Sequence, residues 1–293
     1  MKTGAQPIAT FSLVARDETT GDLGVAVASK FLAVGAYVPA ASSGAGAVAS
    51  QSFVNTTFGP RALRMMAEGA TPEACAEAFR RTDAHIESRQ FGVVSKDGQS
   101  VTFTGKDCHP WAGGRAGSNH AAQGNILAGP EVVDTLVSTF LEAAAPFPER
   151  LLDALAAADA VGGDRRGRQS ASLLVVGEQK GYGGLTDRWI DLRADDHPSP
   201  IAEVQRLLSL HRLFLDKPSQ PSRSLDAHDI DWLQTTLHRL GHLETVTGRW
   251  DKATEKALQA LFGIENLEER WSAGPAIDPV AWDYLRSRFR PNA

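Results

Sequence analysis

Two short apolar runs that are rich in Val, Leu and Ala open the chain. They are residues 10–16 and 23–28, and the segment 17–22 between them carries three acidic residues and a glycine. Apolar runs separated by turn residues of this kind predict a β-hairpin. The next two runs, 36–41 and 46–53, consist mostly of small residues. They predict two further strands that are buried on both faces.

The hydrophobic period changes after these strands. Apolar side chains at helical spacing predict helices over 59–69 and 71–82, the second with Thr71 as N-cap and Pro72 in its first turn. A second hairpin is predicted over 91–104. The order of strands, helices and strands indicates a mixed α and β domain and suits helices packed outside two stacked sheets. The later elements expected are helices at 131–144, 148–161 and 200–215 and strands at 172–176 and 189–192.

A polar, proline-bearing stretch, 216–227, predicts an extended linker. Beyond it, leucines recur at helical spacing from Leu233 to Leu243. A further helix is predicted to begin at Asp251, because its carboxylate can accept hydrogen bonds from the free amides of a first helical turn. Residues 228–293 therefore read as a small all-α domain.

The composition restricts the classes of partner. The 293 residues are 42% hydrophobic and 22% charged, with a formal net charge of -5. Nucleic acids and anionic membranes both require a basic surface on the protein that binds them, so neither is expected as a partner. The expected partner is a small molecule or a peptide. The two cysteines, Cys75 and Cys108, lack the paired spacing of a disulfide scaffold or a zinc site, and no metal or cofactor is expected.

No segment is long and apolar enough to span a bilayer, and residues 1–9 lack the apolar centre of a secretory signal. We therefore expect a cytoplasmic protein, with export left open.

A glycine-rich, highly charged loop at 162–171 runs directly into an apolar strand. Its three arginines offer planar sets of donors that suit a carboxylate or a phosphate. Asp164 and Arg165 are the candidate functional pair, with Gln169 supporting them. A solvated turn, or an ion pair that only ties the loop down, would use the same residues.

Five segments of the chain are informative together: 10–17, 25–30, 51–55, 123–131 and 162–171. They resemble one bacterial family, the domain of unknown function 1028. The resemblance covers about residues 10–215 and implies the fold of the N-terminal-nucleophile hydrolases, a four-layer αββα sandwich. These enzymes use a Thr, Ser or Cys at the start of the mature chain, because the free α-amine acts as the base for its own side chain.

The resemblance makes Thr10 the candidate nucleophile. Nine residues precede it, so residues 1–9 would be a leader that is removed by cleavage between Ala9 and Thr10. Without cleavage, Thr10 has no amine to use and is a β-branched strand residue. The implied activity is hydrolysis of an amide in a small amino-acid-derived or peptide substrate. The alternative is a non-catalytic ligand-binding or assembly protein on the same fold.

Three more side chains are candidates for the site. Lys30 follows the second strand and could lower a neighbouring pKa or hold a carboxylate, or it could be a surface lysine. Asn55 could donate to an oxyanion from a loop that opens onto the site, or it could cap a helix. Trp111, in a glycine-rich loop, could form the aromatic wall of a pocket or belong to a packed surface loop.

The segment 228–293 is similar to the small three-helix peptidoglycan-binding-like domain, in which Asp251 and Thr254 match the start of the second main helix. Peptidoglycan is therefore a candidate partner, although modules of this kind also occur without glycan binding. Folds with stacked layers often pair, so a homodimer is a further expectation.

Overall fold

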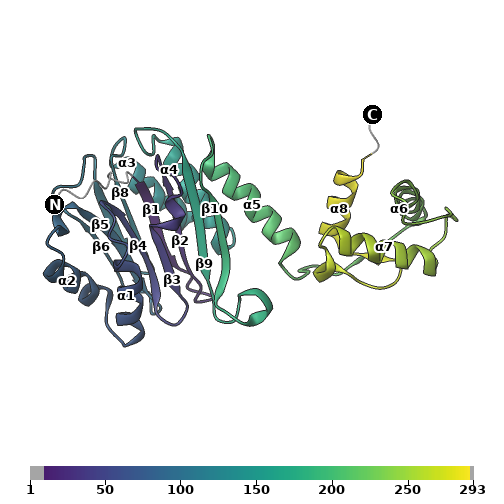
Figure 1. The fold of residues 1–293 in the computed structure, drawn as a ribbon, viewed down its shortest axis with the longest axis horizontal. Coiled ribbons are helices and arrows are strands. Elements are labelled where there is room, and N and C mark those ends of the chain that lie inside the picture. The colour runs from purple at the N-terminus through teal and green to yellow at the C-terminus, as the bar shows by residue number, and fades with distance from the viewer. Residues whose placement is uncertain (1–9, 291–293) are drawn as a thin grey trace. The chain divides into compact units, whose positions relative to one another are not determined.

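The computed structural model describes residues 10–290, and the chain divides into two compact units, one up to Leu207 and one from Leu208 (Figure 1). The described residues contain eight α-helices and several antiparallel sheets. The predicted mixture of α and β structure followed by a helical C-terminal region is confirmed. None of the helices between residues 10 and 290 combines the length and hydrophobicity that crossing a membrane requires.

A six-stranded antiparallel sheet forms one layer of the first unit, in the order β10-β9-β2-β1-β8-β7. Its centre is the predicted hairpin, and the predicted strands near residues 172 and 189 are also present. The glycine- and alanine-rich strands β7 and β8 were not predicted from the sequence. The strands are β1 (Thr10–Arg16), β2 (Leu23–Ser29), β7 (Gly113–Gly117), β8 (His120–Asn125), β9 (Ser170–Val176) and β10 (Arg188–Ala194).

A four-stranded antiparallel sheet lies against the first sheet, with β1 and β2 in contact with its strand β4. Its order follows the chain: β3 (Pro39–Ser42), β4 (Gly46–Ser52), β5 (Arg89–Ser95) and β6 (Ser100–Thr104). The prediction of a strand from residue 36 was wrong at its start, because Val34–Ala36 form a short 3-10 turn. The backbone amide of Val34 donates to Oγ of Ser170 at 3.1 Å, which holds this turn against β9.

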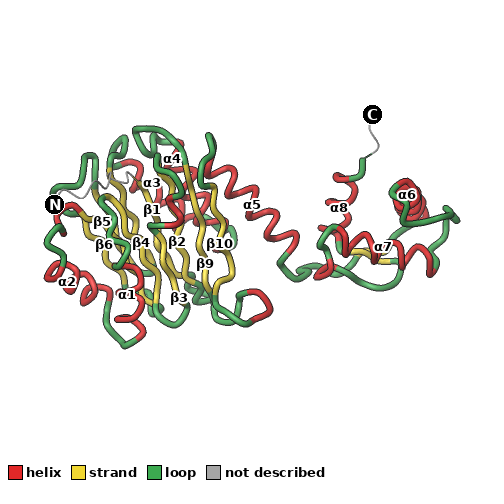
Figure 2. Tube along the Cα trace, in the orientation of Figure 1, coloured by secondary structure: helices red, strands yellow, loops and turns green. Residues whose placement is uncertain are grey.

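Paired helices cover the outer face of each sheet, as the red and yellow segments of Figure 2 show. Helices α1 (Phe58–Ala67) and α2 (Pro72–Thr82) pack on the four-stranded sheet, and α3 (Glu131–Glu142) and α4 (Phe147–Ala160) pack on the six-stranded sheet. Thr71 caps α2 as predicted, since its hydroxyl accepts from the amide of Ala74 at 3.2 Å.

Aromatic rings fill the layer between α1, α2 and the four-stranded sheet. The rings of Phe58 and Phe79 stack with centroids 4.0 Å apart, and Phe91 of β5 meets Phe79 edge-on at 5.3 Å. On the other side, Gly24 of β2 lies against Phe147 and Leu151 of α4. Both helical layers therefore bury apolar surface directly on a sheet, which provides most of the driving force for this packing.

The second unit is built on three helices, α6 (Ala227–Arg239), α7 (Lys252–Ile264) and α8 (Pro279–Arg288). Asp251 caps α7 as predicted, because its Oδ1 accepts from the amide of Thr254 at 2.8 Å. Part of the expected linker is ordered: β11 (Arg223–Ser224) pairs with β12 (Ala276–Ile277). The unit begins inside α5 (Pro200–Phe214), and Leu213 of that helix belongs to its apolar core.

A buried arginine closes the end of α5. Arg270 is 5% exposed and donates from Nε to the carbonyl of Leu213 at 2.6 Å and from Nη2 to the carbonyl of Arg212 at 2.5 Å. Its Nη1 donates to Oδ1 of Asp278 at 3.0 Å, and Asp278 is the residue that caps α8. Helix C-termini leave carbonyls without intrahelical partners, and a cation there also suits the helix dipole.

Arg270→Ala should lower the free energy of unfolding of the second unit by about 3–5 kcal/mol, because it leaves the buried carboxylate of Asp278 without its partner. Tryptophan fluorescence in urea would measure this, since four of the six tryptophans lie beyond residue 230. Arg288→Ala is the matched control, because its side chain is 59% exposed and should change stability by at most about 0.5 kcal/mol. Equal effects of both substitutions would contradict the assignment.

Candidate functional site

The inner faces of the two stacked sheets change from apolar to polar along the strands. At one end, valines and alanines such as Val14, Val25 and Ala47 pack together. At the other end, a transverse row of four polar side chains crosses β9, β2, β1 and β8, because register partners in antiparallel strands share a face. The row consists of Ser170, Ser29, Thr10 and Asn125, each at most 2% exposed.

Thr10 occupies the middle of this row, at the first residue of β1. Its hydroxyl donates to Oγ of Ser29 at 3.2 Å. The structure therefore places the predicted nucleophile where a central strand begins, inside the polar end of the space between the sheets.

Side-chain amides from both sheets meet beside Thr10. Ser12 of β1 donates to Oε1 of Gln51 in β4 at 2.6 Å and accepts from Nε2 of Gln123 in β8 at 2.7 Å. Gln51 in turn donates to Oε1 of Gln90 at 2.8 Å and to the carbonyl of Thr10 at 3.2 Å. These contacts bridge the two sheets at the end where Thr10 lies.

Gln90 of β5 is the centre of this network. Its Nε2 donates to the carbonyl of Gly124 at 2.7 Å and to Oγ1 of Thr104 at 2.9 Å. Its Oε1 accepts from Gln51 and from Nδ2 of Asn125, the latter at 2.9 Å. A buried amide is tolerated when its donors and acceptors are all paired, and Gln90 meets that condition.

The charged loop lies at the same end of the six-stranded sheet. Asp164 is 5% exposed, and its Oδ2 accepts from the backbone amide of Lys30 at 2.8 Å. The ion pair of Asp164 is with Arg166, at 3.0 Å, whereas the candidate functional pair selected from the sequence was Asp164 and Arg165. Arg165 keeps an exposed side chain, and its backbone amide donates to the carbonyl of Ile126 at 3.2 Å.

Lys30 and Gln169 border this loop. Lys30 is exposed, and its Nζ donates to the carbonyl of Arg168 at 3.3 Å. Gln169 donates from its backbone amide to the carbonyl of Ser29 at 3.1 Å and from its side chain to Asp196 at 3.2 Å. Four of the residues selected from the sequence, Thr10, Lys30, Asp164 and Gln169, thus meet at one end of the sheet.

Asn55 lies beyond the end of β4, in a separate polar cluster. Its Nδ2 donates to Oδ2 of Asp83 at 2.9 Å, and its Oδ1 accepts from the amide of Thr57 at 3.1 Å. Burial alone would raise the pKa of Asp83, but hydrogen bonds from Arg89, Asn55 and the backbone of His85 hold the pKa below its usual value. The amide of Asn55 is therefore engaged in a structural cluster around an ionised carboxylate.

Trp111 precedes β7, and its carbonyl accepts from the amide of Leu127 at 3.1 Å. Its ring packs over Gly113, where any larger residue would collide with it. This loop therefore runs alongside the residues that follow Asn125.

The polar residues Asn125, Gln90 and Gln123 were missed as site residues in the sequence. Their signal is an amide at an inward position of a strand whose other inward residues are apolar or small, but that signal requires strand register. Between residues 10 and 290, no group of three or more His, Cys, Asp or Glu side chains is arranged to hold a metal ion.

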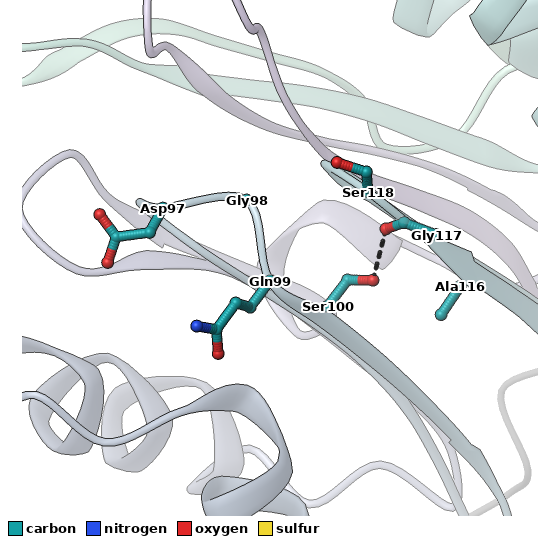
Figure 3. A pocket seen from close by; sticks show the side chains of 7 residues that line it. All are labelled: Asp97, Gly98, Gln99, Ser100, Ala116, Gly117 and Ser118. Carbon is teal, nitrogen blue, oxygen red and sulfur yellow. Dashed lines mark hydrogen bonds between the residues drawn. The ribbon is translucent and has the colours of Figure 1, made fainter.

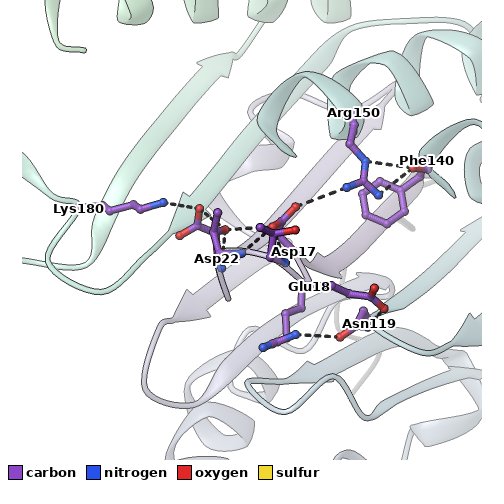
Figure 4. A network of polar contacts seen from close by, with 10 residues as sticks. Asp17, Glu18, Asp22, Asn119, Phe140, Arg150 and Lys180 are labelled. Atoms are coloured by element: carbon purple, nitrogen blue, oxygen red, sulfur yellow. Dashed lines mark hydrogen bonds and ion pairs between the residues drawn. The ribbon is translucent and has the colours of Figure 1, made fainter. Parts of the chain in front are cut away.

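The opposite end of the sheets carries turns that are held by polar contacts. A shallow pocket of about 430 Å³ lies there, lined by Asp97–Ser100 and by Ala116, Gly117 and Ser118 (Figure 3). Figure 4 shows the adjacent ion pairs of Asp17 with Arg150, at 3.4 Å, and of Asp22 with Lys180. These ion pairs anchor the hairpin turn between β1 and β2.

Comparison with known proteins identifies the first unit. Residues 10–204 match the model of the family of unknown function DUF1028. The chain belongs to this family. A crystal structure of a DUF1028 protein from Silicibacter pomeroyi is similar to it, with a TM-score of 0.64 and 29% sequence identity over 70% of this chain and 86% of that chain. Comparison with curated proteins gives no match.

Residues 213–285 match a peptidoglycan-binding-like domain. Both resemblances inferred from the sequence are thus confirmed. The DUF1028 description names no reaction, and the expected homodimer and cytoplasmic location stay predictions.

Gln90→Leu should lower the free energy of unfolding of the DUF1028 unit by at least about 2 kcal/mol. The substitution leaves the buried Nδ2 of Asn125 without its acceptor and removes the donor to the carbonyl of Gly124, and each unpaired buried group costs about 1–3 kcal/mol. Chemical denaturation followed by far-UV circular dichroism would measure the loss. Gln99→Leu is the control, because the same change is made at an exposed turn position; a similar loss there would show that the network contributes nothing specific.

Proposed function

We propose that the DUF1028 unit is an amide hydrolase of the N-terminal-nucleophile type, with the four-layer αββα arrangement of that class and with Thr10 as its nucleophile. The observation that carries the proposal is the position of Thr10 at the first residue of a central strand, with its hydroxyl in a buried polar row between two stacked sheets. A hydroxyl at the start of such a strand needs only cleavage of the preceding peptide bond to gain an adjacent amine.

The reaction would then proceed in two steps. The Thr10 α-amine accepts the proton of Oγ1 as this oxygen bonds to the carbonyl carbon of the substrate amide. The carbon–nitrogen bond breaks, the leaving amine takes the proton, and an ester on Thr10 remains. Water, deprotonated by the same α-amine, attacks the ester carbon and releases a carboxylic acid, while Oγ1 regains its proton.

The surrounding charges suit a substrate that is derived from an amino acid or a peptide. Lys30 and Arg165 are exposed cations at the same end of the sheet, where either could hold a substrate carboxylate. Asp164, which is bound by Arg166 and by the amide of Lys30, would fix the loop rather than take part in proton transfer. Gln169 would position the start of β9, and Trp111 would position the loop before β7. Asn55 would act as an oxyanion donor only if its amide released Asp83.

A second candidate function is non-catalytic ligand binding on the same fold. One observation favours it: Thr10 is an internal residue of the sequence, and it is fully buried. The two functions differ in the covalent state of the chain, since only the hydrolase requires Thr10 to be the first residue.

Intact-mass analysis of the purified protein should show loss of residues 1–9. The processed protein should gain one acyl group from an activated ester, and peptide mapping should place that group on Thr10. Thr10→Ala should lower the rate of this acylation at least about 10³-fold, because the attacking oxygen is absent. Thr10→Ser should retain part of the rate. Thr56→Ala, at an exposed threonine, is the control. Hydrolysis by a chain that keeps residues 1–9 would overturn the proposal.

We further propose that the second unit contacts peptidoglycan. Two surface pockets, of about 570 and 420 Å³, flank α7 and share Ala253 and Lys256, and Trp271 lines the larger one. An aromatic wall beside an exposed lysine suits a sugar that carries a carboxylate or a peptide with a free carboxyl end.

The full chain should sediment with purified peptidoglycan sacculi. Lys256→Glu should weaken this binding by about tenfold, because it places like charge beside the carboxylates of the polymer. Lys217→Glu makes the same charge change at an exposed position outside both pockets and should leave binding unchanged. Failure of the parent chain to sediment would refute peptidoglycan contact.

A further inference from the structure

Asn125 carries a buried acceptor that lacks a donor. This residue ends β8 and is fully buried, and its Oδ1 has no hydrogen-bond partner among residues 10–290. A buried polar atom that stays unpaired costs about 1–3 kcal/mol. Its persistence beside Thr10 therefore requires an explanation.

The hydrogen-bond network fixes which end of this amide is the acceptor. Gln90 must direct its nitrogen to the backbone carbonyl of Gly124, because a carbonyl can only accept. Its oxygen then faces Asn125, so Asn125 must present its nitrogen at 2.9 Å. The unpaired atom is therefore an oxygen, and only a donor can satisfy it.

The strand register identifies a donor that cleavage would create. Arg16 donates its amide to the carbonyl of Asn119 at 2.8 Å, and hydrogen-bonded pairs in an antiparallel ladder recur at every second residue. The same alternation sets the backbone nitrogen of Thr10 opposite the carbonyl of Asn125. In the intact chain that nitrogen has a single N–H, which the ladder uses.

We infer that Asn125 is the positioning residue for the α-amine of Thr10, with Oδ1 accepting the additional N–H that appears when the chain is cleaved ahead of Thr10. This inference rests on the proposed function. A neutral amine has two N–H groups and one lone pair. With one N–H on the carbonyl of Asn125 and the other on its Oδ1, the lone pair is left for the hydroxyl of Thr10. Asn125 would thereby orient the base without touching the substrate.

Several ionisable groups lie in the segments that border Thr10. They are Lys30, Asp164, His109, the buried thiol of Cys108 and the loop arginines Arg165, Arg166 and Arg168. Arg168 is paired with Asp159, and the side chain of Arg165 is exposed. Asp164 is paired with Arg166, and Lys30 is exposed with its ammonium group on the carbonyl of Arg168. The side chains that face Thr10 from the other sheet, Gln51 and Gln90, are neutral.

The test is the titration of the Thr10 amine in the chain that begins at Thr10, obtained by natural processing or by proteolysis at a site inserted ahead of Thr10. The chain is labelled with ¹⁵N-threonine, and the shift of the N-terminal nitrogen is followed against pH by NMR. Asn125→Leu should lower the amine pKa by about one unit, a tenfold change in the proton equilibrium, because the protonated amine loses one acceptor. Asn125→Asp should raise the pKa, since a carboxylate favours the cation.

Ser172→Ala is the matched control. Oγ of Ser172 is also buried without a partner among the described residues, on the inner face of the same sheet, but two strands away from β1. Its removal should leave the amine pKa unchanged. A parent and an Asn125→Leu chain with the same amine pKa would overturn the inference, as would an equal shift in Ser172→Ala. If Asn125→Leu fails to fold, the titration of Asn125→Asp decides alone. An amine pKa in that variant that is unchanged or lower than in the parent would contradict the inference.

The measurement needs no substrate, so its outcome is separate from that of the proposed function. Acylation at Thr10, together with an amine pKa that does not change when Asn125 is replaced, would refute this inference alone. A shifted amine in a chain that acylates nothing would refute the hydrolase and leave the amine contact standing.

Discussion

Side-chain amides that connect the two sheets are the constraint on which the rest of the first unit depends. Apolar sheet faces can slide over one another at small cost, whereas hydrogen bonds between amides are directional. Three of these bonds, from Ser12 to Gln51, from Gln51 to Gln90 and from Asn125 to Gln90, have lengths of 2.6 to 2.9 Å. They connect β4 and β5 of one sheet to β1 and β8 of the other. They do so at the end where Thr10 begins its strand, and they thereby hold the two sheets in place around the candidate site.

This network also depends on close approach of the backbones. Gly92 of β5 faces the side chain of Gln123, and any Cβ at residue 92 would collide with that amide. A glycine here makes room for a hydrogen-bonding side chain from the opposite sheet. The glycine that makes this room weakens β5, because glycine is unfavourable inside a strand. The hydrogen bond from Gln123 to Ser12 offsets that cost.

Local signals allowed part of this structure to be predicted from the sequence. The hairpin turn between β1 and β2 and the helix caps at Thr71 and Asp251 rest on contacts within a few residues, and all three are present. Strand β8 is different, because its small residues show no clear alternation and become a strand by pairing with β1. Its neighbour β7 has the same limitation.

The candidate site shows the same division. Thr10 and Asp164 could be selected by residue type and by resemblance, but the partner of Asp164 could not, since Arg165 and Arg166 are adjacent and chemically identical. Which of them folds back on Asp164 depends on the path of the loop, and the structure selects Arg166. Asn125 and Gln90 are 35 residues apart in the sequence, and their roles emerge only when β8 and β5 are brought face to face.

The closure of α5 by Arg270 has a consequence for how such a chain can be assembled in evolution. The apolar core that contains Leu213 belongs to the second unit, although the helix that supplies it starts in the first. A gene fusion that joined the two modules at the proline-bearing stretch, residues 216–227, would leave the appended module without Leu213, which is part of its apolar core. The exchangeable piece must therefore begin within a helix, and any host would have to offer a helical end in phase with it.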